Sequence, residues 1–284
     1  MKTALFVSAN LIGDALYISQ AWNEWYKRNQ DFERIDLLTL PDHITTLYKD
    51  MGVPCNVITA PVAPVEWYDF QHTFDVNKAF ALSDAKRQHI SQSYADLLGV
   101  PLQKDPDGLF LKPIYLPAES NDPRIEENRG AILVSMFSAS DASRGNPPQP
   151  PNKMLPWPKW IPILKALRGS FPERAIRFLG APTDRAPAEL QIGEEAYLTG
   201  VPLNVLAQIM RNCLFLLTVD NGMGHLAASQ EAREFVLYPA CLGQHYILPW
   251  GNKNMAFLQM NPVTVSPAQI VWSLRSITRK WGLV

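Results

Sequence analysis

The sequence predicts an α/β protein made of two Rossmann-like, doubly wound domains that face one another across a cleft. Two observations lead to this expectation. Short apolar segments alternate with helical segments along both halves of the chain, as in parallel sheets covered by helices. Two of the apolar segments run directly into glycine-containing turns that open a helix, at residues 10–14 and 220–224. With 284 residues, 47% of them hydrophobic, the chain can bury two cores of ordinary size.

Each half has its own set of expected elements. In the first half they are strand 3–9, helix 15–28, strand 35–40, helix 47–51, strand 55–58 and an amphipathic stretch at 83–98. In the second half they are strand 131–137, helix 159–168, strand 175–180, helix 204–211, strand 214–219 and strand 234–238. Pro, Ser, Asn and acidic residues cluster at 117–129, which is typical of a linker. We therefore expect one domain at 1–126 and a second at 127–284, with the last helix free to pack back on the first domain.

The most informative stretch is 217–228, where an apolar strand breaks into a glycine-bracketed loop and opens a helix. Its candidate ligand-binding residues are Asp220, Asn221, Gly222, Met223, Gly224 and His225. Unpaired backbone N–H groups and the helix dipole favour an anion such as phosphate at this kind of helix start. Glycines let the backbone approach a ligand closely, and His225 offers a side-chain donor or a partial positive charge. Asp220 can hold a ribose hydroxyl or anchor the loop, and an ordinary strand-to-helix turn is the alternative.

This stretch resembles the D-S-G-x-x-H-x-A-A signature of glycosyltransferase family 9, the lipopolysaccharide heptosyltransferases, with Asn221 in place of the usual serine. Three further segments resemble that family. The turn at 10–14 is similar to its I-G-D turn, and residues 83–100 are similar to its Y-x-x-L-L-G segment. Residues 130–160 are similar to its strand, small-residue loop and K-x-W-P segment. The resemblance covers nearly the full chain and implies the GT-B fold.

In that family the aspartate of the N-terminal turn is the proposed general base, and the resemblance carries this role to Asp14. A carboxylate beside a glycine-lined cleft can take a proton from an acceptor hydroxyl as it attacks an anomeric carbon. Aspartate is also a favoured helix N-cap, which is the alternative role. Asn10, Gly13 and His89 are the other acceptor-side candidates, although His89 suits a helix-surface or interdomain position better than a catalytic one.

The family's lysine in K-x-W-P neutralises the donor diphosphate. In this chain Lys153 lies two residues too far from the tryptophan, so the cation is either Lys153 or Arg144 of the preceding polar loop. The alternative is that both are solvated loop charges. Ser138 of the same loop and Gly200, which the resemblance places near the nucleobase, complete the expected donor site.

Charge divides unevenly along the chain, with a net −6 over residues 1–129 and +5 over 130–284, which together make the −1 of the whole. The second half is therefore the better host for an anionic donor, and the acidic first half disfavours duplex nucleic acid. No apolar run approaches the roughly 20 residues of a membrane span, and no signal-peptide pattern is seen, so a cytoplasmic protein is expected. Three scattered cysteines predict no disulfide framework, and the absence of metal and cofactor motifs predicts neither group.

Together with these features, the resemblance to glycosyltransferase family 9 implies a metal-independent, inverting glycosyltransferase. It would move a sugar from a nucleotide-diphosphate sugar to an acceptor hydroxyl, most like a heptosyltransferase acting on a lipopolysaccharide-type glycan. Two alternatives stay open. One is the same chemistry on another acceptor, such as a hydroxymethylated base of viral DNA, and the other is a non-catalytic nucleotide-sugar binding protein.

Overall fold

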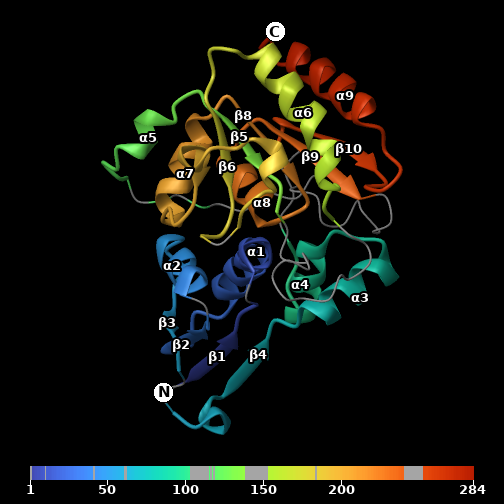
Figure 1. Cartoon of the computed structure of the whole chain (residues 1–284). Coiled ribbons are helices and arrows are strands. Elements are labelled where there is room, and N and C mark those ends of the chain that lie inside the picture. The colour runs from blue at the N-terminus through green and yellow to red at the C-terminus, as the bar shows by residue number, and fades with distance from the viewer. Residues whose placement is uncertain are drawn as a thin grey trace. The chain divides into compact units, whose positions relative to one another are not determined.

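The computed structural model divides the chain into two compact units that part between Ser120 and Asn121 (Figure 1). The structure describes residues 2–9, 11–40, 42–60, 63–102, 115, 117, 119–137, 153–182, 184–239 and 252–284. The border expected from the sequence, after residue 126, falls inside the short helix α5 (Arg124–Glu127). Helix α5 packs on a helix of the second unit, so the linker region begins that unit.

The first unit is a parallel sheet with helices. Its elements are β1 (Thr3–Val7), α1 (Ile12–Arg28), β2 (Arg34–Leu38), α2 (Asp42–Asp50), β3 (Asn56–Ile58), η1 (Val65–Trp67), β4 (Phe70–Thr73), α3 (Val76–Lys86) and α4 (Ile90–Leu98). The strand order is β3-β2-β1-β4, and each neighbouring pair runs parallel. The chain therefore winds from β1 to β3 on one side and then crosses to the other side of β1. This change of direction lies between β1 and β4.

Aromatic side chains join the first sheet to helix α1. Phe6 of β1 is fully buried and meets Trp22 and Trp25 of α1 edge to face, with ring centroids 4.2 and 4.8 Å apart. Phe70 of β4 packs on Trp25 at 5.3 Å. Such pairs bury large apolar area and add a specific geometry, so they fix α1 against β1 and thereby the turn between them.

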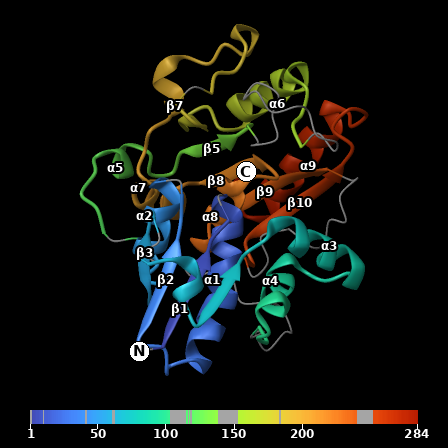
Figure 2. The ribbon, with the colours of Figure 1, turned by 90° about the horizontal axis from the view of Figure 1, so that it is seen from below.

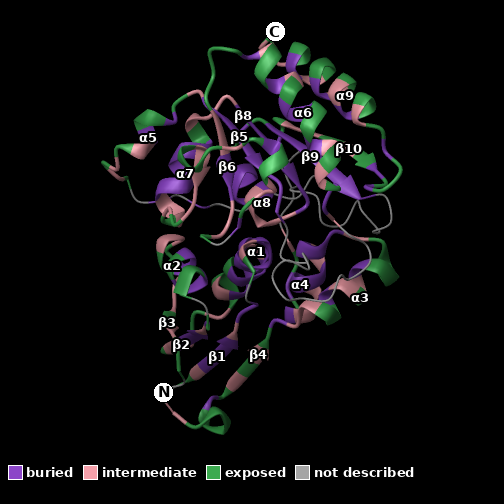
Figure 3. Ribbon diagram, in the orientation of Figure 1, coloured by how far each residue is buried: buried purple, intermediate pink, exposed green. Residues whose placement is uncertain are grey.

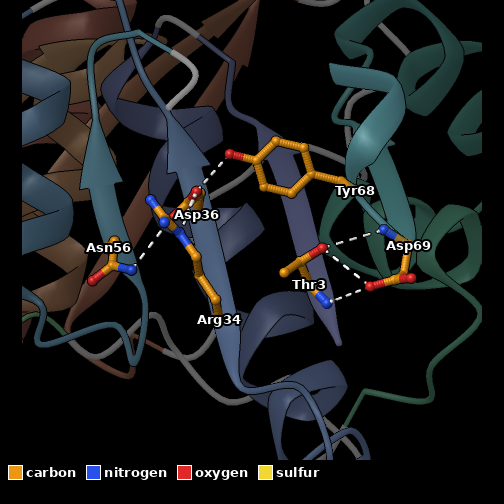
Figure 4. Close-up of polar contacts among 6 residues, drawn as sticks. All are labelled: Thr3, Arg34, Asp36, Asn56, Tyr68 and Asp69. Carbon is orange, nitrogen blue, oxygen red and sulfur yellow. Dashed lines mark hydrogen bonds and ion pairs between the residues drawn. The ribbon is translucent and has the colours of Figure 1, made fainter. Parts of the chain in front are cut away.

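A buried carboxylate at the centre of β2 is fully engaged by neighbours (Figure 4). Asp36 is inaccessible to solvent and forms an ion pair with Arg34 Nε at 3.0 Å. Its carboxylate also accepts hydrogen bonds from Asn56 Nδ2 at 3.1 Å and from the Tyr68 hydroxyl at 2.6 Å. A buried charge is tolerated only when paired and hydrogen-bonded in this way, so this network ties β2, β3 and the segment before β4 together.

The amphipathic stretch expected at 83–98 is split between two helices. Helix α3 ends at Lys86, and Arg87 takes a left-handed backbone conformation with φ of 50°. The Ser83 hydroxyl bonds the carbonyl of Gln88 at 2.5 Å, and α4 then begins at Ile90. Helical periodicity alone misses this break, because the competing bonds that end α3 come from its own side chains.

The second unit has the larger sheet. Besides α5, its elements are β5 (Ile132–Ser135), α6 (Trp157–Ser170), β6 (Ile176–Leu179), η3 (Ala188–Leu190), η4 (Glu194–Ala196), β7 (Tyr197–Leu198), α7 (Leu203–Asn212), β8 (Phe215–Val219), α8 (Gly222–Ser229), β9 (Glu234–Pro239), β10 (Met255–Met260) and α9 (Pro267–Lys280). The strand order is β10-β9-β8-β5-β6-β7, and all neighbouring pairs are parallel. The direction of winding changes between β5 and β8. These two central strands are buried along their whole length, as parallel strands covered on both faces should be.

The last helix belongs to the second unit. Ile270 and Leu274 of α9 share one buried core with Trp160 and Ile163 of α6, and Figures 1 and 2 agree in placing these two helices side by side. Figure 3 shows exposed residues alternating with buried ones along both helices, while the strands beneath are mostly buried. The apolar face of α9 therefore contributes to the core of its own unit.

No helix in the described part of the chain is long and apolar enough to cross a lipid bilayer.

Candidate functional site

The start of helix α8 is held by the side chain of Asn221, the residue that caps it. Its Oδ1 accepts hydrogen bonds from the backbone N–H groups of Met223 at 3.0 Å and Gly224 at 3.3 Å. From the sequence, unpaired backbone N–H groups at the start of this helix were expected to bind a phosphate. Two of them are instead occupied by the cap, so a ligand here must rely on the remaining N–H groups and on side chains.

Asn221 also joins the two central strands of the second sheet. Its Nδ2 donates to Ser135 Oγ at 2.8 Å and to the carbonyl of Phe137 at 2.7 Å, both at the end of β5. Thr218 of β8 donates to its Oδ1 at 3.1 Å. A serine could cap the helix but has no amide to donate twice toward β5. The departure from the family's serine therefore has a structural reason.

The two glycines of this turn have different surroundings. Gly224 is buried, and a Cβ added there would meet Thr218 Cγ2 at 3.4 Å and Glu234 Oε2 at 3.6 Å, which are ordinary contacts. The side of Gly224 where a Cβ would stand therefore faces β8 and β9 of its own unit. Gly222 and Met223 are half-buried, so the backbone of the first helical turn is what a ligand could approach.

Lys153 reaches this helix start in the second unit. Its Nζ lies 2.6 Å from Oδ2 of Asp220, whose side chain is 4% exposed, while the lysine side chain is 26% exposed. The longer spacing from the tryptophan does not prevent the lysine from reaching the end of β8. Asp220 thus anchors the cation, and the lysine keeps enough exposure to meet a second anion.

His225 lies one helical turn further along α8 and is 8% exposed. Burial lowers the pKa of His225 to about 4, with Asp220 raising the pKa and Lys153 lowering it as smaller effects. The imidazole is therefore neutral at pH 7. The sequence allowed His225 to contribute either a hydrogen-bonding group or a positive charge. A neutral imidazole can contribute the hydrogen-bonding group but not the charge.

The other donor-side candidates are more scattered. Gly200 has a left-handed φ of 65° in the turn after β7, at the carboxyl edge of the same sheet but three strands from β8. Arg144 and Ser138, like Asn10 of the first unit, lie outside the described residues. The structure therefore brings Lys153, Asp220, Asn221 and His225 together and leaves Gly200 apart.

In the first unit, Asp14 is not the helix cap. Helix α1 begins at Ile12, three residues before the expected start, and Leu11 occupies the cap position without a side-chain cap bond. Asp14 lies inside the first turn, where its charge suits the helix dipole, and is 8% exposed. Its Oδ1 accepts a hydrogen bond from the Tyr94 hydroxyl at 2.8 Å. The capping alternative is therefore wrong, and Gly13 is simply buried beside Asp14 in the same turn.

Two buried tyrosines flank this carboxylate. Burial, followed by the charge of Asp14, raises the pKa of Tyr94 well above its ordinary value. Burial also raises the pKa of Tyr48 on α2, and Asp14 adds to that shift. Sequence reasoning assigned neither tyrosine a role, because their approach to Asp14 comes from the packing of α1 with α2 and α4.

His89 has a structural position. It is the N-cap of α4, its Nδ1 accepts the backbone N–H of Ser91 at 3.2 Å, and its ring meets Tyr17 edge to face at 5.1 Å. The side chain is 5% exposed. The structure thus gives His89 a capping role, and its acceptor-side assignment stays a prediction.

Within the described residues, no three His, Cys, Asp or Glu side chains gather as metal ligands would.

Comparison with known proteins identifies the fold. No family model and no curated protein matches the sequence. Among solved structures, the chain is similar to the ADP-heptose lipopolysaccharide heptosyltransferase II of E. coli, with 13% identity, a TM-score of 0.59, and coverage of 99% of this chain and 100% of that one. It is also similar to a glycosyltransferase family 9 protein of Veillonella parvula, with 12% identity, a TM-score of 0.62, and coverage of 98% and 97%.

A third similar structure is an E. coli heptosyltransferase solved with ADP, with 13% identity, a TM-score of 0.59, and coverage of 99% and 100%. All three alignments run over nearly the whole of both chains, so the likeness includes both sheets. In fold, the chain is a two-domain GT-B protein like the glycosyltransferases of family 9.

Proposed function

We propose that the protein is a metal-independent, inverting glycosyltransferase that uses a nucleotide-diphosphate sugar. One observation carries the proposal: each unit places its candidate chemical groups where the winding of its sheet changes direction. Asp14 follows β1, next to the β1–β4 change, and Asn221 bridges β5 and β8 at the other change. In open parallel sheets, ligands bind outside the carboxyl ends of the strands at such points.

The second unit supplies groups suited to the donor. Lys153 can exchange part of its contact with Asp220 for a diphosphate oxygen, which neutralises the leaving group. The half-buried backbone at Gly222 and the neutral His225 offer further hydrogen-bonding groups near the same helix start. The leaving group of the reaction is a nucleoside diphosphate. A fixed cation beside its phosphates therefore stabilises the negative charge that develops on them during transfer.

The first unit supplies the base. Asp14 takes the proton of the acceptor hydroxyl while that oxygen forms a bond to the anomeric carbon. The bond from this carbon to the diphosphate oxygen breaks on the opposite side, so the configuration inverts and the nucleoside diphosphate departs. The proton ends on the Asp14 carboxylate, and no further reactant is needed.

The first donor to test is ADP-heptose, because one similar E. coli protein is an ADP-heptose heptosyltransferase and another was solved with ADP. A lipopolysaccharide-type glycan is the corresponding acceptor class. Purified protein should be screened against nucleotide-diphosphate sugars by thermal shift and by release of nucleoside diphosphate. We expect one donor to stabilise the fold and to be slowly hydrolysed.

The Asp14→Asn variant separates binding from chemistry. It should keep the donor-induced thermal shift, because the donor groups lie in the second unit, and should lose hydrolysis and transfer. Absence of stabilisation by every nucleotide sugar, with the protein folded, would contradict the proposal. Loss of donor binding in the variant would make Asp14 a structural residue.

A further inference from the structure

Tyr94 makes a contact that apolar packing alone does not require. Its side chain is fully buried on α4, and its hydroxyl donates to Asp14 Oδ1 at 2.8 Å across 80 residues of sequence. Helices α1 and α4 pack closely along one another. A buried phenol needs a polar partner, and here that partner is the carboxylate assigned as the base.

The groups around the carboxylate keep this bond intact. Burial, then the charge of Asp14 and more weakly Asp75, raise the pKa of Tyr94, so its hydroxyl keeps its proton wherever a carboxylate can act as base. From α2, Tyr48 is also influenced by Asp14, but its hydroxyl accepts a bond from Ser8 at 2.8 Å. The hydroxyl of Tyr94 bonds Asp14 directly.

We propose that Tyr94 is a positioning residue for glycosyl transfer, whose hydroxyl holds the carboxylate of Asp14 in place to take the acceptor proton. This role rests on the proposed function. A general base works only within hydrogen-bond reach and correct alignment, and fixing one carboxylate oxygen removes much of the side chain's rotational freedom. A hydrogen bond to a carboxylate favours its charged form over its protonated form.

The first test is Tyr94→Phe, which removes the hydroxyl and keeps the ring. We expect kcat to fall by about tenfold with the donor KM unchanged, since base alignment is a part of the full effect of general base catalysis. The acid limb of the kcat pH profile should move to higher pH, because Asp14 loses a hydrogen bond to its charged form. If Tyr94 had only a structural role, the Tyr94→Phe variant would show no shift of the acid limb of the pH profile and no selective fall of kcat.

The matched control is Tyr115→Phe. Tyr115 is also fully buried in the first unit, and its hydroxyl donates to Asp50 Oδ2 at 3.0 Å. This variant loses the same kind of bond and should keep both kcat and the acid limb. If Tyr94→Phe behaves like Tyr115→Phe in both respects while wild-type protein transfers sugar, the positioning role is wrong.

A second measurement does not depend on turnover. Urea unfolding of Tyr94→Phe, Asp14→Asn and the double variant forms a thermodynamic cycle. Loss of the hydroxyl should destabilise the protein more with aspartate at position 14 than with asparagine, because the bond is charge-assisted. If the hydroxyl contributes equally to the free energy of unfolding in both backgrounds, Tyr94 does not bond Asp14 and the proposed role of Tyr94 is wrong. Clear coupling in a wild-type protein that transfers no sugar would instead overturn the proposed function, and the positioning role with it.

Discussion

At the scale of single residues, position 221 shows how much one side chain can organise. Asn221 caps α8 and bonds the end of β5 through its amide. Asn221→Ala should lower the free energy of unfolding by about 2–3 kcal/mol, because it removes a cap and leaves partners unsatisfied. Asn221→Ser, which keeps a capping oxygen, should lose less. Urea denaturation checks this, and equal stability of all three proteins would contradict it.

Glu234 gives a pH dependence that the sequence does not suggest. It is fully buried at the start of β9, and in the described part of the chain Asn252 Nδ2 bonds its carboxyl at 2.8 Å. Burial raises the pKa of Glu234 well above its usual value, while the Asn252 bond lowers it. The folded state therefore favours the protonated acid. This contribution to stability is complete below the unfolded-state pKa of 4.5 and is lost as pH rises toward the folded-state pKa.

Glu234→Gln should therefore become more stable relative to wild type as pH rises above 4.5, since glutamine keeps the shape without the charge. Thermal unfolding of both proteins from pH 4 to 8 measures this difference. A difference that stays constant across the range would show that Glu234 does not titrate abnormally.

The sequence singles out candidate residues where a motif carries them and misses contacts that depend on tertiary packing. Asp14 and the Asp220–His225 stretch were found from local pattern and resemblance. The Tyr94 bond joins helices far apart in sequence, and the double use of the Asn221 amide depends on where β5 ends. The motif that contains Tyr94 does not announce this bond, and the sequence does not announce the contacts of Asn221, because both depend on which helices and strands become neighbours.

At the scale of elements, segments with a clear apolar pattern were predictable, and several partly buried strands were not. The strands at β5, β8 and β9 and the helices α1, α6 and α7 follow apolar patterns that survive in the structure. Strands β4, β7 and β10 were missed, since they are short or only partly buried and so lack a clear apolar pattern. Helix α1 also begins earlier than expected, which moves Asp14 from the cap into the first turn.

The capping role of His89 can be tested at this scale. His89→Ala should lower the free energy of unfolding by about 1 kcal/mol, because the start of α4 loses its side-chain cap. His89→Asn should restore much of the loss, since asparagine is a good cap. Sugar transfer should remain near the wild-type level in both variants. Loss of transfer in a stable His89→Asn protein would return His89 to the acceptor site.

At the scale of the whole molecule, both sheets are doubly wound, and each has its candidate groups at the change of winding direction. The alternation of strands and helices predicted this fold class, and full-length likeness to solved glycosyltransferases agrees with it. The strand order could not be predicted from the sequence, because it depends on the side of β1 and of β5 to which the later strands add. Yet that order is what brings β5 beside β8 and gives Asn221 its partners.

The central claim is that the second unit binds the donor diphosphate and the first unit supplies the base. The most direct measurement is calorimetric titration of nucleoside diphosphate into Lys153→Ala and Asp14→Asn, with Lys165→Ala of α6 as a control for loss of a surface charge. Because Lys153 is the cation at the α8 start, we expect its loss to weaken binding by about tenfold or more. The single variant Lys153→Ala leaves the buried Asp220 carboxylate without its lysine partner. The double variant Lys153→Ala/Asp220→Asn tests whether this unpaired charge, and not the loss of the lysine, weakens nucleoside diphosphate binding.

Asp14→Asn and Lys165→Ala should bind nucleoside diphosphate as wild type does, and only Asp14→Asn of these two should lose transfer. Unchanged nucleoside diphosphate affinity in Lys153→Ala, or binding lost in Asp14→Asn, would contradict this division of roles between the two units.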